Sequence, residues 1–169
     1  MSPDQVNQQT VGAGPRECPE CGAAQARLTC RERLELLLSW EVDDEALRGH
    51  HFLTVASFNL QHPAAFTDEA RSGLEDALDG YLDGRVTITD IRRRASRATR
   101  IHRPADDVRF RRREWPITID MVAVPGQPAN AATRVLDWAE SIRRARIDAF
   151  DRRASVREFL DVDRRPNDA

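Results

Sequence analysis

The short segment CPECG, residues 18 to 22, constrains this chain more than any other part of its sequence. Two cysteines separated by two residues can place their thiolates at the angle that tetrahedral zinc requires, and the glycine that follows permits a tight turn behind them. A third cysteine, Cys30, follows at the expected start of a helix, where the helix dipole favours a thiolate. We therefore predict that Cys18, Cys21 and Cys30 bind Zn²⁺.

Two other interpretations of the cysteines remain open. A thioredoxin-like redox pair uses the same C-x-x-C spacing, but it follows a strand in a βαβ unit that this sequence lacks. A buried set of cysteines without a metal is the second alternative. A zinc deaminase is disfavoured, because no H-x-E precedes the zinc knuckle, residues 18–22, and the proline follows the first cysteine instead of preceding it.

The sequence after the knuckle predicts a mainly α fold. We expect a small helical bundle, with the zinc knuckle packed on the hairpin that its first two helices form. Thr29 and Glu32 form a capping-box pattern, which starts a helix that runs to about Glu41 or Val42. Residues 43–49 read as a polar link. Further helices are expected over residues 50–61, 67–82 and 131–150, the last extending toward residue 160.

Two segments give weaker patterns. Thr89 with Asp90 indicates the start of a short additional helix. Within residues 104–130, the segment VRFRRREWPITIDMV at 108–122 alternates apolar and polar side chains well enough for a short β-hairpin near 106–122. Thr118 with Asp120 equally indicates a helix turn in the same place, and both alternatives stay open.

Composition favours one compact unit. The chain has 169 residues, 40% of them hydrophobic, enough to bury one core. We expect a flexible leader over residues 1–16, a single zinc-binding helical domain over 17–160 and a polar tail over 161–169. No stretch is apolar enough for a membrane span or a signal peptide, so we expect a cytoplasmic protein with reduced thiols and no membrane association.

Two histidines are candidates for the fourth zinc ligand. His51 and His62 stand eleven residues apart on one expected helix. They are therefore about 16 Å apart along its axis and cannot share one zinc ion. Antiparallel packing of the first two helices pairs Cys30 with His62 at one end and Glu41 with His51 at the other. Between them, the same register pairs Leu34 with Phe58 and Leu37 with Val55.

This register predicts His62 as the fourth ligand, with His51 as the alternative fourth ligand. The other reading of His62 is a histidine favoured by the dipole at a helix C-terminus. Glu41 and His51 are tentative catalytic residues, because a buried carboxylate and an imidazole can act as a general base. Half of a second metal site and a structural ion pair are the other interpretations of that pair.

The motifs resemble an uncharacterised bacterial family, a domain of unknown function. They are CPECGA at 18–23, Cys30, Glu41, HFLTV at 51–55 and QHP at 61–63, followed by TIDMV at 118–122 and the pair Trp138 and Ala139. The resemblance implies a metal-binding helical fold and supplies no activity. The family pattern also includes a histidine pair in its last helix, which this chain lacks, so a second site that needs that pair is in doubt.

Ten arginines in residues 92–113 suggest a contact with nucleic acid. Acidic residues are interleaved and the net charge is -2, so nucleic-acid binding is disfavoured.

Two functions remain. The first is a structural Cys3His zinc protein that binds a protein partner or forms a homodimer as an accessory or regulatory protein. The second is a metal-dependent enzyme that uses zinc-bound water, with Glu41 or His51 as general base.

Overall fold

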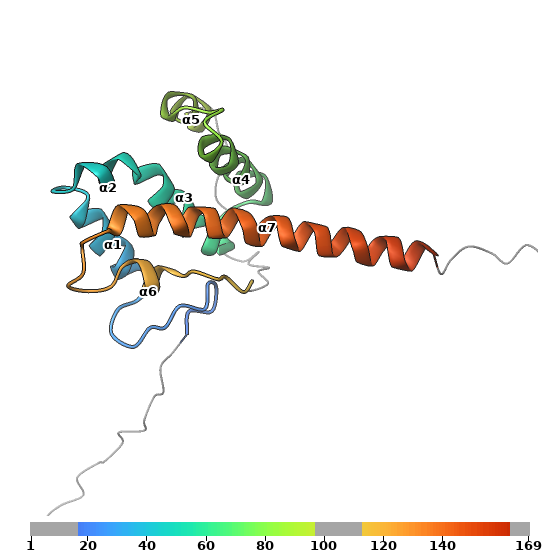
Figure 1. Ribbon diagram of the computed structural model, residues 1–169, viewed down its shortest axis with the longest axis horizontal. Helices are drawn as coiled ribbons and strands as arrows, with labels where there is room; N and C mark the ends of the chain where they lie inside the picture. Colours follow the sequence, from blue (N-terminus) through green and yellow to red (C-terminus); the bar gives the residue numbers. More distant parts are fainter. Residues whose placement is uncertain (1–16, 97–112, 163–169) are drawn as a thin grey trace, which may run out of the picture.

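The computed structural model describes residues 17–96 and 113–162, with side chains described as far as residue 148. This part of the chain is mainly helical, as the sequence predicts (Figure 1). The expected leader over 1–16 and most of the expected tail lie outside it. In chain order the elements are α1 (Cys30–Trp40), α2 (Glu45–Gly49), α3 (His51–Gln61), the 3-10 turn η1 (Pro63–Ala65), α4 (Asp68–Leu82), α5 (Ile88–Ala95), α6 (Ile119–Val122) and α7 (Ala131–Val162).

The start of α1 is fixed by its capping box. The Thr29 hydroxyl accepts a hydrogen bond from the Glu32 backbone amide at 3.2 Å, and the Glu32 carboxylate accepts one from the Thr29 amide at 2.7 Å. Two backbone donors that a helix start leaves without partners are thereby satisfied. Cys30 becomes the first residue of α1, so the cap also determines where its sulfur lies.

The centre of the bundle is α3, which packs against α1, α2, α4 and α7. α7 crosses the whole body and continues beyond it (Figure 1). The core between these two helices is made of large and small apolar side chains at helical spacing, namely Leu53, Ala56 and Leu60 from α3 with Val135, Trp138 and Ile142 from α7. α3 is therefore held on several sides, and its two ends are well placed to carry rigid sites.

Two short helices differ from the sequence prediction. Residues 43–49 contain α2, which the prediction missed: the Asp44 carboxylate caps it by accepting from the Leu47 amide at 2.9 Å, and Leu47 is fully buried. A single apolar residue in a polar stretch gives no periodicity from which to predict a helix. The additional short helix, α5, exists but begins two residues early, because Thr87 with Asp90 forms its capping box.

Of the two alternatives for residues 106–122, the described part, 113–122, forms a helix turn and no strand. That turn is α6, which begins after Thr118, and both Ile119 and Val122 are buried beside α1. The buried guanidinium of Arg33 donates to the Ala123 carbonyl at 3.0 Å, which ties α1 to the end of α6. Residues 106–112 lie outside the described part of the chain.

Among the helices in the described ranges, none has the length and apolar character needed to cross a membrane.

Candidate metal centre

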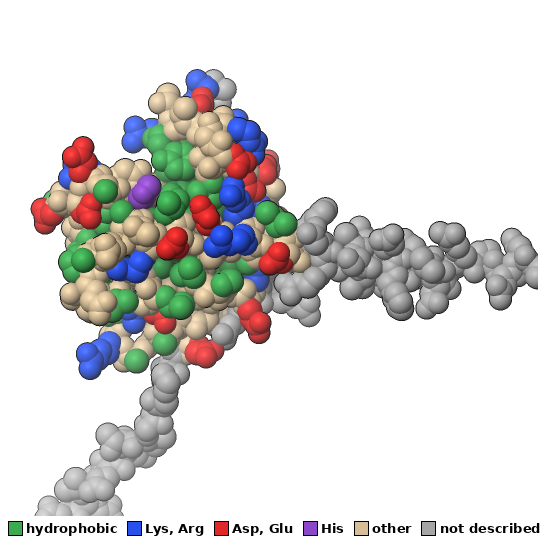
Figure 2. Space-filling model, in the orientation of Figure 1, with side chains coloured by type: hydrophobic (Ala, Val, Ile, Leu, Met, Phe, Trp, Pro, Cys, Tyr) green, Lys and Arg blue, Asp and Glu red, His purple; other side chains and the backbone are tan. Residues whose placement is uncertain are grey.

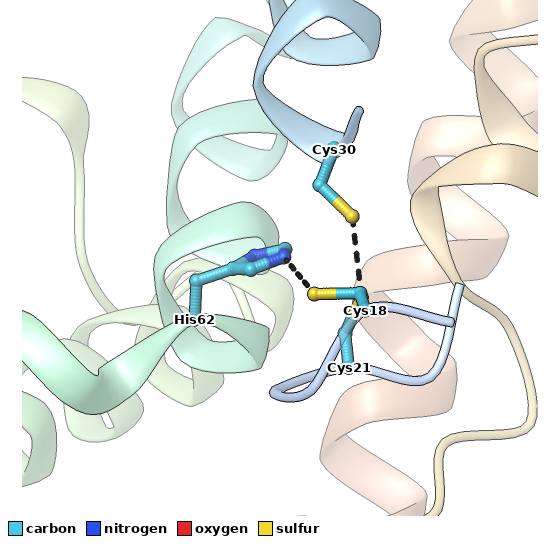
Figure 3. A group of neighbouring side chains, drawn as sticks. All are labelled: Cys18, Cys21, Cys30 and His62. Carbon is cyan, nitrogen blue, oxygen red and sulfur yellow. Dashed lines mark hydrogen bonds between the residues drawn. The ribbon is translucent and has the colours of Figure 1, made fainter. Parts of the chain in front are cut away.

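Four side chains meet where the N-terminus of α1 approaches the C-terminus of α3. They are Cys18, Cys21, Cys30 and His62, and their candidate ligand atoms all lie within 4.8 Å of one another. In Figure 3 the side chains of Cys18, Cys21 and Cys30 lie close to the imidazole of His62, with the knuckle loop below the first turn of α1. The three cysteines are almost completely buried, with at most 4% of each residue exposed.

The loop that carries the first two cysteines is a tight hydrogen-bonded turn. The Cys18 amide donates to the Ala23 carbonyl at 2.8 Å, and the Gly22 amide donates to the Cys18 carbonyl at 3.0 Å. Gly22 has a φ of 83°, a left-handed conformation that glycine adopts without steric cost. The glycine in CPECG therefore has the role in the turn that the sequence suggested.

Two carboxylates anchor this loop to the rest of the fold. Glu20 accepts a hydrogen bond at 2.9 Å from the amide of Ala64 in η1, two residues after His62 in the chain. Asp120 of α6 accepts one from the Ala24 amide at 3.0 Å. The sequence prediction missed both anchors. The first joins residues that are 44 positions apart in the chain and the second joins residues that are 96 positions apart, and no local pattern marks such pairs.

His62 is oriented by the last turn of α3. Its Nδ1 atom donates to the Phe58 carbonyl at 2.8 Å, and its ring stacks on the Phe58 ring with centroids 4.1 Å apart. A carbonyl can only accept, so the proton is on Nδ1 and the lone pair of Nε2 points toward the cysteines, 3.6 Å from the Cys18 sulfur. A ring nitrogen held by a backbone carbonyl is the usual arrangement behind a histidine metal ligand.

The spacing of the donor atoms fits a single tetrahedral ion. The sulfur atoms of Cys21 and Cys30 are 3.5 Å apart, and all three cysteines are free thiols. Two thiolates bound to one zinc at the usual bond length and tetrahedral angle lie about 3.8 Å apart. A set of three sulfurs and one imidazole nitrogen is also chemically suited to zinc.

The surroundings favour negative charge on Cys30. Its pKa is lowered to about 4, first by the hydrogen bond from Cys21, against the effect of burial, and further by His62 and Gln25. The same hydrogen bond, together with burial, raises the pKa of Cys21. For His62, burial lowers the pKa, but its interactions with Cys30 and the Phe58 carbonyl raise it overall. The negative charge of the cluster is therefore favoured at Cys30, with Cys21 as its hydrogen-bond donor.

Glu41 and His51 meet at the opposite end of the α1 and α3 pair, as the predicted register requires. His51 Nδ1 lies 2.6 Å from a carboxylate oxygen of Glu41, whose side chain is 8% exposed, whereas the His51 side chain is 58% exposed. The other oxygen of Glu41 is buried and has no hydrogen-bond partner in the described structure. α3 is continuous from His51 to Gln61, so His51 stands about 16 Å along the helix from His62. His51 is not part of the cysteine cluster.

The arginine-rich segment is only partly described, because residues 97–112 lie outside the described ranges. In the described part of the segment, Arg93 forms an ion pair with Asp90. The Arg113 guanidinium lies over the Trp115 ring, 5.2 Å from the ring centroid. Basic and acidic side chains are interspersed on the face shown in Figure 2. The predicted absence of nucleic-acid binding stays a prediction.

Fold and site together define a small helical protein with a candidate Cys3His metal centre. Residues 16–146 match a family of unknown function (DUF5946), and the chain belongs to it. The match includes the four residues of the cluster, Glu41 and His51. No curated protein and no solved structure matches the chain. The resemblance to a family of unknown function is confirmed, and the metal centre must be interpreted from its own geometry.

Proposed function

We propose that this chain is a cytoplasmic zinc-binding protein whose Cys3His site is structural, and that the folded domain acts as an accessory or regulatory binding protein. The observation that carries the proposal is the convergence of four ligand atoms within 4.8 Å from three separate elements. The three thiols of the cluster are buried, and the Phe58 carbonyl orients the imidazole. Free thiols suit a reducing compartment.

A structural role follows from the composition of the site. Four protein ligands complete a tetrahedral shell, which leaves no position for a water molecule. Three thiolates also neutralise the charge of Zn²⁺, which makes the ion a poor Lewis acid. The burial of all three cysteines supports a closed site in which the metal contributes to folding and not to catalysis.

The metal would stabilise a part of the fold that has little hydrophobic core. Residues 17–24 form a loop with one isolated β-bridge, between Glu17 and Ala24, and their buried side chains are chiefly the two cysteines and Ala23. A zinc ion bound there would join this loop to the start of α1 and the end of α3. Such sites can supply much of the folding free energy of a small module.

The alternative, an enzyme in which Glu41 or His51 activates a zinc-bound water, finds less support. The general base would have to reach across about 16 Å, the rise of the continuous helix between His51 and His62. His51 Nδ1 lies 2.6 Å from a Glu41 carboxylate oxygen at the opposite end of the hairpin, which favours a separate role for that pair. We assign the pair to structural stabilisation of the α1 and α3 hairpin.

Metal analysis of the purified full chain tests the proposal. Mass spectrometry of the metal content should find about one zinc per chain in the wild type and in His51→Ala. Cys18→Ser, Cys30→Ser and His62→Ala should lose most of it. Because His51 begins α3 and His62 caps its end, His51→Ala is a matched control for the removal of an imidazole. If His51→Ala loses zinc while His62→Ala retains it, the proposed ligand set is wrong.

The binding role needs a separate measurement. Light scattering after size-exclusion chromatography should report either a dimer or a monomer that associates with a partner protein. We expect Cys30→Ser to weaken that association, because loss of the metal loosens the fold that presents the surface. An association unchanged in a zinc-free variant would separate the binding role from the metal.

A further inference from the structure

The three cysteines of the metal centre have different neighbours. The sulfur atoms of Cys21 and Cys30 lie 3.5 Å apart and share a hydrogen bond. The Cys18 sulfur instead contacts Nε2 of His62 at 3.6 Å, and Figure 3 marks both contacts with dashed lines. The two sulfurs in contact therefore join the knuckle loop to α1. They are not the C-x-x-C pair, Cys18 and Cys21, that a motif-based reading would select.

A disulfide between Cys21 and Cys30 requires only a short movement. Both are free thiols, and their sulfur atoms would have to approach by about 1.5 Å to reach the S–S bond length of about 2.05 Å. Rotation of one thiol about its Cα–Cβ bond can supply such a movement. The backbones of the knuckle loop and of α1 are already positioned for this link, because the turn at Gly22 and the capping box fix them.

The segment that covers Cys30 is short and open to solvent. Residues 25–29 form neither helix nor strand, and each is at least partly exposed. From this loop the Gln25 side-chain amide donates to the Cys30 sulfur at 3.7 Å, and Cys30 itself is 4% exposed. Segments with few buried contacts open locally at low cost in free energy. Opening of this loop is enough to admit a small oxidant while the helices stay packed.

We propose that the metal centre is also a redox switch, in which hydrogen peroxide converts the Cys21 and Cys30 thiolates to a disulfide and the zinc ion leaves. The inference rests on the proposed zinc site. Cys18 and His62 would remain as two protein ligands, whereas a structural zinc site needs four. The disulfide keeps the knuckle loop joined to α1, but the connection through the metal to the end of α3 is lost.

The chemistry needs no reactant besides the peroxide and protons from the solvent. The thiolate sulfur of one cysteine attacks a peroxide oxygen, so that an S–O bond forms, the O–O bond breaks and hydroxide leaves. The second thiolate attacks the resulting sulfenic sulfur, the S–S bond forms, the S–O bond breaks and another hydroxide leaves. Each hydroxide takes up a proton. The two sulfurs lose two electrons in total, and the peroxide is reduced to two water molecules.

The switch is reversible in a reducing compartment. Disulfides in such compartments are usually transient, and many of them sense oxidants. A thiol reductant restores both thiols, after which the four ligands can bind zinc again. Oxidation would therefore loosen the joint between the knuckle and α3 for a limited time, and with it the surface that the proposed binding role requires.

Peroxide treatment of the zinc-loaded full chain tests this inference. Pyridylazoresorcinol reports the released zinc, and the protein is then alkylated and digested without reduction. Trypsin cuts after Arg27, which separates Cys30 from the other two cysteines. A glutamate-specific protease cuts after Glu20, which separates Cys18 from Cys21. Mass spectrometry of the doubly digested protein therefore identifies the cysteines that are joined.

We expect loss of about one zinc per chain, together with a peptide pair joined through Cys21 and Cys30. Dithiothreitol with added zinc should reverse both changes. His51→Ala retains all four proposed ligands and is the matched control, so it should lose zinc and form the disulfide as the wild type does.

The outcomes separate this inference from the proposed function. A chain that holds no zinc before oxidation would refute both. Zinc-loaded protein that joins Cys18 to Cys21, that releases zinc without a disulfide, or that keeps its zinc in excess peroxide would overturn the redox switch alone. In each of those three cases the zinc bound before oxidation would still support the proposed metal site.

Discussion

The sulfur atoms of Cys21 and Cys30 lie 3.5 Å apart, although the two residues belong to different elements. One is in the knuckle loop and the other is the first residue of α1. The distance is close to that between two thiolates on one tetrahedral ion, about 3.8 Å. The capping box at Thr29 and the turn at Gly22 fix the two backbones independently, so the fold itself brings these sulfurs together.

Loss of the metal should destabilise the whole domain. We expect Cys30→Ser to lower the free energy of unfolding by more than about 4 kcal/mol, a size that loss of a bound metal can reach and most substitutions do not. A strong chelator should produce a similar loss in the wild type and little further change in the variant. Thermal and urea unfolding measure both effects, and equal stability of wild type and variant would contradict the expectation.

His51→Ala should weaken the fold without affecting zinc. The variant leaves the buried carboxylate of Glu41 without its hydrogen-bond partner, which costs about 1–3 kcal/mol. Glu41→Leu combined with His51→Ala should recover much of that loss, since removal of both partners leaves no buried charge. Urea unfolding gives these values. A double variant no more stable than His51→Ala would point to a role for Glu41 beyond this pair.

Much of the fold and the cluster could be predicted because local signals carried them. The capping box at Thr29, the proline at Pro63 and the spacing of apolar residues along α1 and α3 are properties of neighbouring residues. The pairing of Cys30 with His62 then followed from helix geometry. In the middle of the register Leu34 and Leu37 are buried, whereas Val55 and Phe58 are only partly buried, so the pairing of these residues stays a prediction.

What the sequence did not predict depends on long-range contacts. The hydrogen bonds of Glu20 with Ala64 and of Asp120 with Ala24 join distant segments. The apolar pocket that Leu74 of α4 and Ile91 of α5 line depends on how two helices are placed, which apolar periodicity does not specify. α2 was missed because its one buried residue, Leu47, has no periodic partner.

Two glycines of α4 should respond oppositely to alanine. Gly73→Ala should raise the free energy of unfolding by about 0.5–1 kcal/mol, because the site is open and helical. Gly80→Ala should lower it, because the new Cβ would lie 2.6 Å from a methyl carbon of Val86. Val86→Ala in the Gly80→Ala background should restore part of the loss. Equal responses of the two glycines in chemical denaturation would argue against this packing.

The capping carboxylate of Glu32 should titrate below its ordinary range. Its pKa is lowered by the hydrogen bonds that it accepts from the Thr29 amide and hydroxyl. A carboxyl group with a lower pKa in the folded state stabilises the fold above its unfolded pKa and loses that contribution as pH falls through the folded value. Carbon-detected NMR titration should show the Glu32 midpoint rising in Thr29→Ala. An identical midpoint in both proteins would mean that the capping box does not form in solution.

The central claim, a closed Cys3His zinc site, is tested most directly by X-ray absorption at the zinc edge of the full chain. We predict a first shell of three sulfur atoms at about 2.3 Å and one nitrogen at about 2.0 Å, with no oxygen. The His62→Ala variant should lose the nitrogen or the metal, whereas His51→Ala should give the wild-type spectrum. Purified wild-type protein that binds no zinc, or a shell containing a water oxygen in place of the imidazole, would contradict the account.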